Sequence, residues 1–137
     1  MLVMAQRGET TAIQRAIDQG ADLNEVDDDW FPLMMAVAVN QTAVVELLLR
    51  NGALVDMTDR NGLSSLALAV QEGHVGPILT LLEHGADVNR ASDSGAVPLL
   101  IAAQTGNVAV VDVLTQRGAD ARRACDAHTR SKRIVFL

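Results

Sequence analysis

The stretch EHGADVNRASDSGAVPLL, residues 83–100, contains the motif that decides the fold, because its Gly-Ala-Asp triplet occurs three times in the chain. The triplet begins at Gly20, Gly85 and Gly118, and Gly52 is also followed by Ala. These four glycines are 32, 33 and 33 residues apart. A fixed period of this length is typical of a solenoid made of stacked repeats.

Apolar residues and a second series of glycines keep the same period. Leucines recur at positions 33, 66 and 99, and again at 48, 81 and 114, and alanines recur at 36, 69 and 102. The second glycine series comprises Gly8, Gly73 and Gly106, with Asn40 in the remaining place. Asn is the best substitute for Gly where a helix ends in a left-handed residue. The shared period predicts that every repeat has the same local structure.

Each repeat is expected to contain two short helices followed by an extended hairpin. Residues 98–106, PLLIAAQTG, form the first predicted helix, with Pro98 in its first turn. Residues 107–118, NVAVVDVLTQRG, form the second, which ends at glycine. Helices this short cannot bury an apolar face alone, whereas stacked pairs share a continuous core.

These motifs resemble the ankyrin-repeat family, whose pattern is approximately D-x-x-G-x-T-P-L-H-x-A-A, then G-H, V-V, L-L and G-A-D-V-N. Residues 59–91 match through Asp59, Gly62, Leu66, the Gly73-His74 pair and the run GADVN at 85–89. The resemblance implies an all-α solenoid of stacked antiparallel helix pairs with β-hairpin-like loops. It divides an ankyrin-repeat domain, 1–124, into units 1–25, 26–58, 59–91 and 92–124, and leaves 125–137 as a basic tail or partial capping unit.

Three positions depart from the family pattern. Asp29 stands where the hairpin glycine is expected and the preceding linker is one residue short, so the first hairpin is predicted to be distorted. Ser64 replaces the usual Thr and is expected to cap its helix. Arg15 occupies an apolar position, which suits an end unit that faces water.

Composition bounds the class of protein. About half of the 137 residues are apolar and the aromatics number three, so the core must be built from aliphatic side chains. The single cysteine, the lack of an apolar run of about 20 residues and the lack of a signal peptide favour a cytoplasmic protein. Residues 122–133 carry +4 of a net charge of −6, so the rest carries −10, which disfavours nucleic acid as the main partner.

No constellation of residues suggests an enzyme, a metal site or a cofactor. Cys125 and His128 are too few for a metal site, and no His or Cys pair has the usual ligand spacing. The run Asp27-Asp28-Asp29 lacks the spaced ligands of a calcium loop and is better explained as a solvated hairpin tip.

The resemblance implies a non-catalytic protein–protein interaction module that binds an unidentified partner protein on its concave face, to recruit, inhibit or protect it. Carried over by position, the hairpins contribute Asp27, Asp28, Trp30, Arg60, Asn61, Leu63, Asp93, Ser94 and Ala96. The inner helices contribute Met34, Val39, Gln71, Glu72, Gln104 and Thr105.

Two features of this surface have competing explanations. Trp30 is the only tryptophan, and it is either an interface hot spot or, with Phe31, a filler of the distorted first hairpin. The acidic residues Asp59 and Glu72, with those of the first hairpin, either attract a basic partner or are simply solvated.

Two alternatives to this function remain open. The chain is a structural fragment of a larger multidomain protein, or it contacts an anionic surface or nucleic acid through residues 122–133. Three explanations of the basic tail also remain open. It is solvated and mobile, it docks on the acidic body of the same or another molecule, or it binds a partner and ends in the apolar run IVFL at 134–137.

Overall fold

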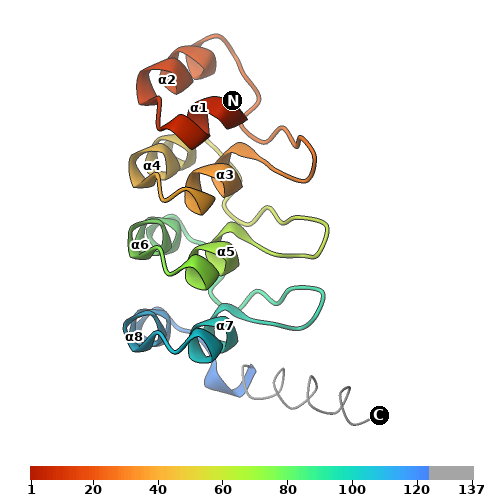
Figure 1. Cartoon of the computed structure of the whole chain (residues 1–137), viewed down its shortest axis with the longest axis vertical. Coiled ribbons are helices and arrows are strands. Elements are labelled where there is room, and N and C mark those ends of the chain that lie inside the picture. Colours follow the sequence, from red (N-terminus) through yellow and green to blue (C-terminus); the bar gives the residue numbers. More distant parts are fainter. Residues whose placement is uncertain (124–137) are drawn as a thin grey trace.

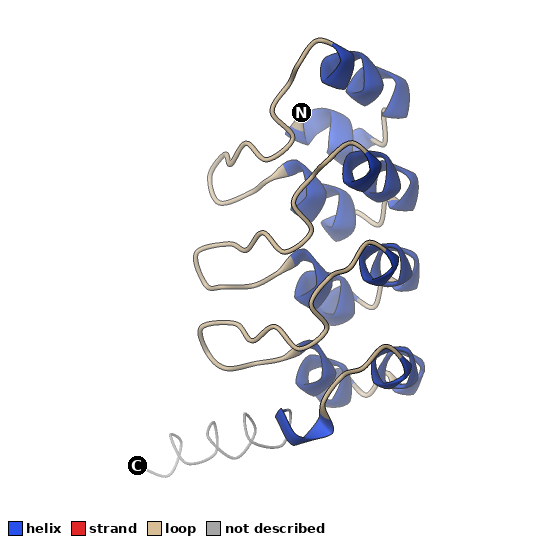
Figure 2. Cartoon of the chain, turned by 180° about the vertical axis from the view of Figure 1, so that it is seen from behind, coloured by secondary structure: helices blue, strands red, loops and turns tan. Residues whose placement is uncertain are grey.

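The computed structural model describes residues 1–123, and it is a row of stacked helix pairs with a loop projecting from each junction (Figure 1). The helices are α1 (Leu2–Arg7), α2 (Thr10–Asp18), α3 (Pro32–Ala38), α4 (Thr42–Arg50), α5 (Ser65–Glu72), α6 (Val75–Glu83), α7 (Pro98–Thr105) and α8 (Val108–Gln116). The odd-numbered helices form an inner layer beside the loops and the even-numbered helices an outer layer. Seen from behind, the described part of the chain consists of helices and loops without strands (Figure 2). The predicted all-α solenoid is confirmed.

The turn inside each pair ends the inner helix in a left-handed residue. Gly8, Gly73 and Gly106 have φ values of 72°, 72° and 74°. Asn40 occupies the same place in the second pair with φ 58°. The prediction that Asn40 replaces a left-handed glycine is therefore confirmed.

The start of α5 differs from the starts of α3 and α7. Pro32 and Pro98 occupy the first position of their helices, where a missing N–H costs nothing. Ser65 stands at this position in α5, and Ser64 caps the helix through a 3.1 Å hydrogen bond that its Oγ accepts from Ala67 N–H. The Oγ of Ser65 is fully buried and has no hydrogen-bond partner in the described part of the chain.

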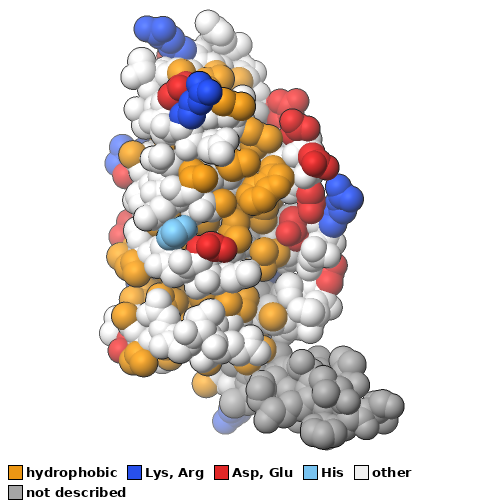
Figure 3. Space-filling view, in the orientation of Figure 1, with side chains coloured by type: hydrophobic (Ala, Val, Ile, Leu, Met, Phe, Trp, Pro, Cys, Tyr) orange, Lys and Arg blue, Asp and Glu red, His pale blue; other side chains and the backbone are white. Residues whose placement is uncertain are grey.

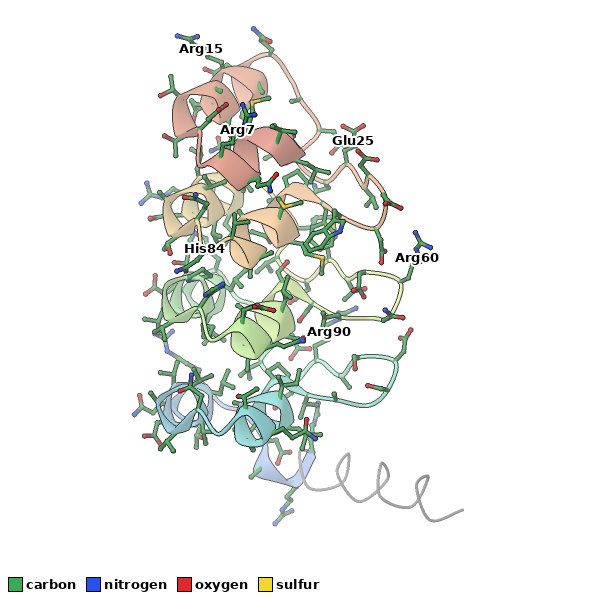
Figure 4. All side chains as sticks on the ribbon, in the orientation of Figure 1. Arg7, Arg15, Glu25, Arg60, His84 and Arg90 are labelled. Carbon is green, nitrogen blue, oxygen red and sulfur yellow. The ribbon has the colours of Figure 1, made fainter. Side chains whose placement is uncertain are left out.

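The core is a continuous column of aliphatic side chains that belong to the repeating positions. Leu33, Leu66 and Leu99 are buried where successive inner helices pack together, and Leu48 and Leu81 are buried in the outer layer. Their burial explains why the apolar positions keep the period of the glycines. Arg15 on α2 is exposed at the end of the stack, as expected for an end unit (Figure 4).

Side-chain hydrogen bonds between the linkers fix the register of neighbouring units. Asn24 Oδ1 accepts a 2.9 Å bond from the N–H of Leu54. Asp56 Oδ1 accepts one of 2.9 Å from Asp87 N–H. The corresponding bond, from the N–H at position 120 to Asn89 Oδ1, measures 2.8 Å. These three bonds, referred to as the linker ladder, repeat at equivalent positions along the chain.

The first hairpin differs from the others, and the difference takes the form of a shorter turn. Asp27 and Trp30 exchange two backbone hydrogen bonds of 2.8 and 2.9 Å, so only Asp28 and Asp29 form the turn. Their φ values of 48° and 71° are those of a type I′ turn, which suits the twist of paired extended segments. The next hairpin is one residue longer and has Gly62 at φ 73°. The missing residue is thus absorbed by a tighter turn.

The predictions for residues 125–137 lie outside the described residues, and the proposed division into units stays a prediction. Within residues 1–123, no helix combines the length and the apolar character that a membrane span requires.

Candidate functional site

A hollow of about 640 Å³ lies between the hairpins of residues 59–63 and 92–96 and the inner helices α5 and α7. It is lined by Asp59, Asn61, Leu63, Gln71, Ser92, Asp93, Ser94, Ala96, Ile101, Gln104 and Thr105. Side chains from two neighbouring repeats therefore share one depression on the hairpin side of the molecule.

Hydrogen bonds donated by backbone N–H groups hold the hairpin wall of the hollow in place. Asp59 Oδ1 accepts bonds of 2.9 Å from the N–H groups of Asn61 and Leu63, and these close the first loop. The N–H of Asp93 donates a 2.8 Å bond to the carbonyl of Asn61, which joins the two hairpin tips. These polar groups of the two hairpins are therefore satisfied within the chain itself.

Close contact between the hairpins explains the glycine at position 62. A Cβ on Gly62 would lie 2.6 Å from Asp93 Oδ1 and 3.0 Å from Asp93 N. The carboxylate of Asp93 therefore lies directly against the turn of the preceding hairpin. Both the left-handed φ and this approach disfavour a larger residue at this position.

The helix side of the hollow combines an apolar floor with polar groups at the helix ends. Ile101, Gln104 and Thr105 are separated by three and four residues, so they share one face of α7. Leu63 contributes apolar surface from the hairpin, and Gln71 lies near the end of α5. This floor can accept apolar side chains, while the amides can donate and accept hydrogen bonds.

Many of the residues predicted for the site are brought together here. The predicted residues that line the hollow are Asn61, Leu63, Gln71, Asp93, Ser94, Ala96, Gln104 and Thr105. The remaining predicted residues lie outside the hollow.

Trp30 occupies the position in its hairpin that corresponds to Leu63 and Ala96, one and two repeats further along. It is 37% exposed, whereas the neighbouring Phe31 is buried. Phe31 thus fills the core, as the packing explanation expected, whereas Trp30 stays accessible, as the hot-spot explanation requires. The assignment of Trp30 as a hot spot remains a prediction.

The assignment of Met34 to the surface is wrong. Met34 is only 3% exposed, because it lies on the face of α3 that packs into the core. Val39 is partly exposed, and Met35, one turn earlier on the helix, is also partly exposed. Met35 lies four positions before Val39 and shares its face, so Met35 is the more exposed of the two methionines of α3.

The predicted charged residues outside the hollow are exposed. Asp27 and Asp28 lie on the first hairpin and Glu72 at the end of α5. Arg60 points outward from the second hairpin (Figure 4), with its guanidinium 3.7 Å from Asp29 and 4.0 Å from Asp28. These exposed ion pairs contribute little to stability, but the charge of Arg60 partly neutralises the acidic tip of the first hairpin.

Sequence reasoning missed Ser92 and Ile101, and it assigned Asp59 only to an acidic rim. Ile101 could have been found from the helical period, because it precedes Gln104 and Thr105 by three and four residues. Asp59 and Ser92 stand at the same hairpin position, 33 residues apart.

The hairpin side of the molecule combines apolar and acidic surface. Figure 3 shows a hydrophobic band that runs along the stack beside the inner helices, with acidic side chains on the hairpins at its edge. No Lys, Arg or His side chain of the described residues lines the hollow. The local potential therefore favours a cationic group.

The described residues include no group of three His, Cys, Asp or Glu side chains that could hold a metal ion. His84 uses its ring nitrogen Nδ1 for a 3.0 Å contact with the carbonyl of Thr80. His74 is the N-cap residue of α6. The imidazoles of His74 and His84 thus lie at the two ends of α6.

Comparison with known proteins agrees with this architecture. The family model described as "Ankyrin repeats (3 copies)" matches residues 1–92 and 61–125. The human and mouse proteins named ankyrin repeat family A protein 2 are 39% identical over 72 residues, which cover 52% of this chain and 23% of theirs. The human 2-5A-dependent ribonuclease is 33% identical over 77 residues, covering 55% of this chain and 10% of that enzyme.

The chain thus spans under a quarter of the length of these curated relatives. The family match covers both the helix pairs and the hairpins that form the hollow. The chain belongs to the ankyrin-repeat family.

Proposed function

We propose that this chain is a non-catalytic protein–protein interaction module that binds a partner protein on the side formed by its hairpins and inner helices. Ankyrin repeats are in general protein–protein interaction modules. The observation that carries the proposal is the hollow between two repeats, which has a hydrogen-bonded wall and an apolar floor. Recruitment, inhibition or protection of the partner, and a cytoplasmic location, are parts of the same proposal.

The physical character of this side supports protein binding. Trp30, Leu63 and Ala96 repeat at one hairpin position, so apolar groups are presented at regular intervals along the stack. Tryptophan offers a large apolar area and one hydrogen-bond donor, a combination that is enriched at interface hot spots. A wall whose polar groups are already bonded loses little conformational freedom on association.

Affinity capture with two matched variants tests the proposal. The first variant, Trp30→Ala/Leu63→Asp, changes the proposed binding side. The second, Val75→Ala/Val108→Ala, changes two exposed residues at the starts of the outer helices α6 and α8. Thermal unfolding first establishes that both variants fold.

The proposal predicts a partner that is retained by the wild-type chain and the outer-helix variant and is lost by the Trp30/Leu63 variant. Equal retention by all three chains would place the binding site elsewhere. If only the outer-helix variant lost the partner, the binding site would lie on the outer helices and not on the hairpin side.

A further inference from the structure

We propose that the element received by the hollow is an extended segment of the partner that carries a Lys or Arg residue close to an apolar residue. Its cation contacts the carboxylates of Asp59 and Asp93, and its apolar side chain packs on Leu63 and Ile101. This inference rests on the proposed function and names the chemistry of the partner at that site.

The size of the hollow favours a segment over a folded face. The hollow is a depression open to solvent, and its volume of about 640 Å³ is of the order of small-ligand sites, roughly 300–1,000 Å³. A standard interface between folded proteins covers about 800 Å² on each partner and is usually flatter. The hollow therefore fits a few consecutive residues.

The charges of the hollow favour a cation. Asp59 and Asp93 both line it, and no ion pair joins either of them to a basic residue within the described part of the chain. Asp59 uses Oδ1 for the hairpin bonds, which leaves Oδ2 as an acceptor. Because hydrogen bonds between a carboxylate and a cationic donor are stronger than neutral ones, a Lys or Arg side chain is the matching group.

The polar groups around the floor favour an extended backbone. The side-chain amides of Gln71 and Gln104 line the hollow and make no hydrogen bonds to other described residues. An extended segment presents unbonded N–H and C=O groups along its length, whereas a helix satisfies its own. Two free amides on neighbouring repeats can therefore bind a strand-like segment more readily than a helix.

Selection from a display library of random short peptides tests the chemistry directly. Three proteins are used as targets: the wild-type chain, Asp59→Asn/Asp93→Asn, and Glu83→Gln/Asp112→Asn. The first double variant removes two charges from the hollow and keeps an oxygen acceptor at position 59 for the hairpin bonds. The second removes two charges from exposed residues of the outer helices. Circular dichroism and thermal unfolding verify the folds.

The wild-type chain and the outer-helix variant are expected to enrich peptides with a Lys or Arg at a constant distance from an apolar residue. The hollow variant should lose the preference for the cation and bind an enriched peptide about tenfold more weakly, and added salt should weaken the wild-type complex. An unchanged cation preference in the hollow variant, or salt-independent binding, would overturn the proposal.

Failure of this inference can be distinguished from failure of the proposed function. If no peptide is enriched but capture still yields a partner that the Trp30/Leu63 variant loses, the binding side is correct and the extended cationic segment is wrong. If both experiments give no binding on this side, the proposed function fails as well.

Discussion

The carboxylate of Asp29 accepts a 2.9 Å hydrogen bond from the backbone N–H of Arg60, which lies 31 residues further along the chain. The same oxygen lies 3.7 Å from Nε of Arg60. Asp29 also has a φ of 71°, a left-handed value that Asp and Asn tolerate better than most residues. One side chain thus shapes the first hairpin and attaches it to the second.

Replacing Asp29 by Ala is expected to destabilise the fold by about 1–2 kcal/mol, because the change removes the acceptor and places Ala in a left-handed conformation. Asp29→Asn keeps the acceptor and should cost less than about 0.5 kcal/mol. Urea unfolding followed by circular dichroism measures both values. Equal losses for the two variants would show that the hydrogen bond contributes nothing.

Ser65→Pro is expected to stabilise the chain by about 1 kcal/mol. The substitution removes the buried hydroxyl that has no described partner and installs the residue found at the same position in α3 and α7. The preceding residue, Ser64, has φ −82° and ψ 162°, which suits a residue before proline. Ser65→Ala serves as the control, since it removes only the hydroxyl. A proline variant less stable than the alanine variant would contradict this account.

Leu54→Asn is expected to stabilise the second linker by about 0.5–1 kcal/mol. Asp22, Asp87 and Asp120 each accept a bond from the backbone N–H two residues on, and Leu54 occupies the equivalent place without an acceptor. Leu54 is also 58% exposed, so little apolar burial is lost. Thermal unfolding of Leu54→Asn is compared with that of Leu54→Ala. If the two midpoints coincide, the added acceptor does not form the turn.

Gly62→Ala is expected to destabilise the chain by about 1–2 kcal/mol and to weaken peptide binding at the hollow. The added Cβ would force Asp93 away from the hairpin turn and would occupy a left-handed conformation. Gly95→Ala is the control, because Gly95 has a similar φ of 86° and no atom near its added Cβ. Urea unfolding should show a larger loss at position 62. Equal losses would mean that contact with Asp93 is unimportant.

The sequence predicted those parts of the fold that obey local rules. The glycine period, the left-handed Asn40 and the cap at Ser64 each depend on a few neighbouring residues, and each is found in the structure. Met34 was assigned to the wrong face because exposure depends on the rotation of α3 within the stack. One residue of error in helical phase moves a side chain by about 100° around the axis, from surface to core.

The hollow itself could not be found from the sequence alone. Its wall depends on a hydrogen bond between Asn61 and Asp93, which belong to different repeats. Its rim depends on the position of the Asp93 carboxylate against Gly62. The first hairpin shows the same limit, since counting residues revealed the deletion but not the type I′ turn that accommodates it.

The linker ladder has a mechanical consequence. Its bonds join adjacent units, and among the described residues none joins the first pair of helices to the last. Small rotations at each junction would therefore add along the row, so the curvature of the whole stack could change while neighbouring hairpin tips keep the bonds that join them. A ligand that touches several tips would select one curvature. Its affinity would then depend in part on the stiffness of junctions that it never contacts.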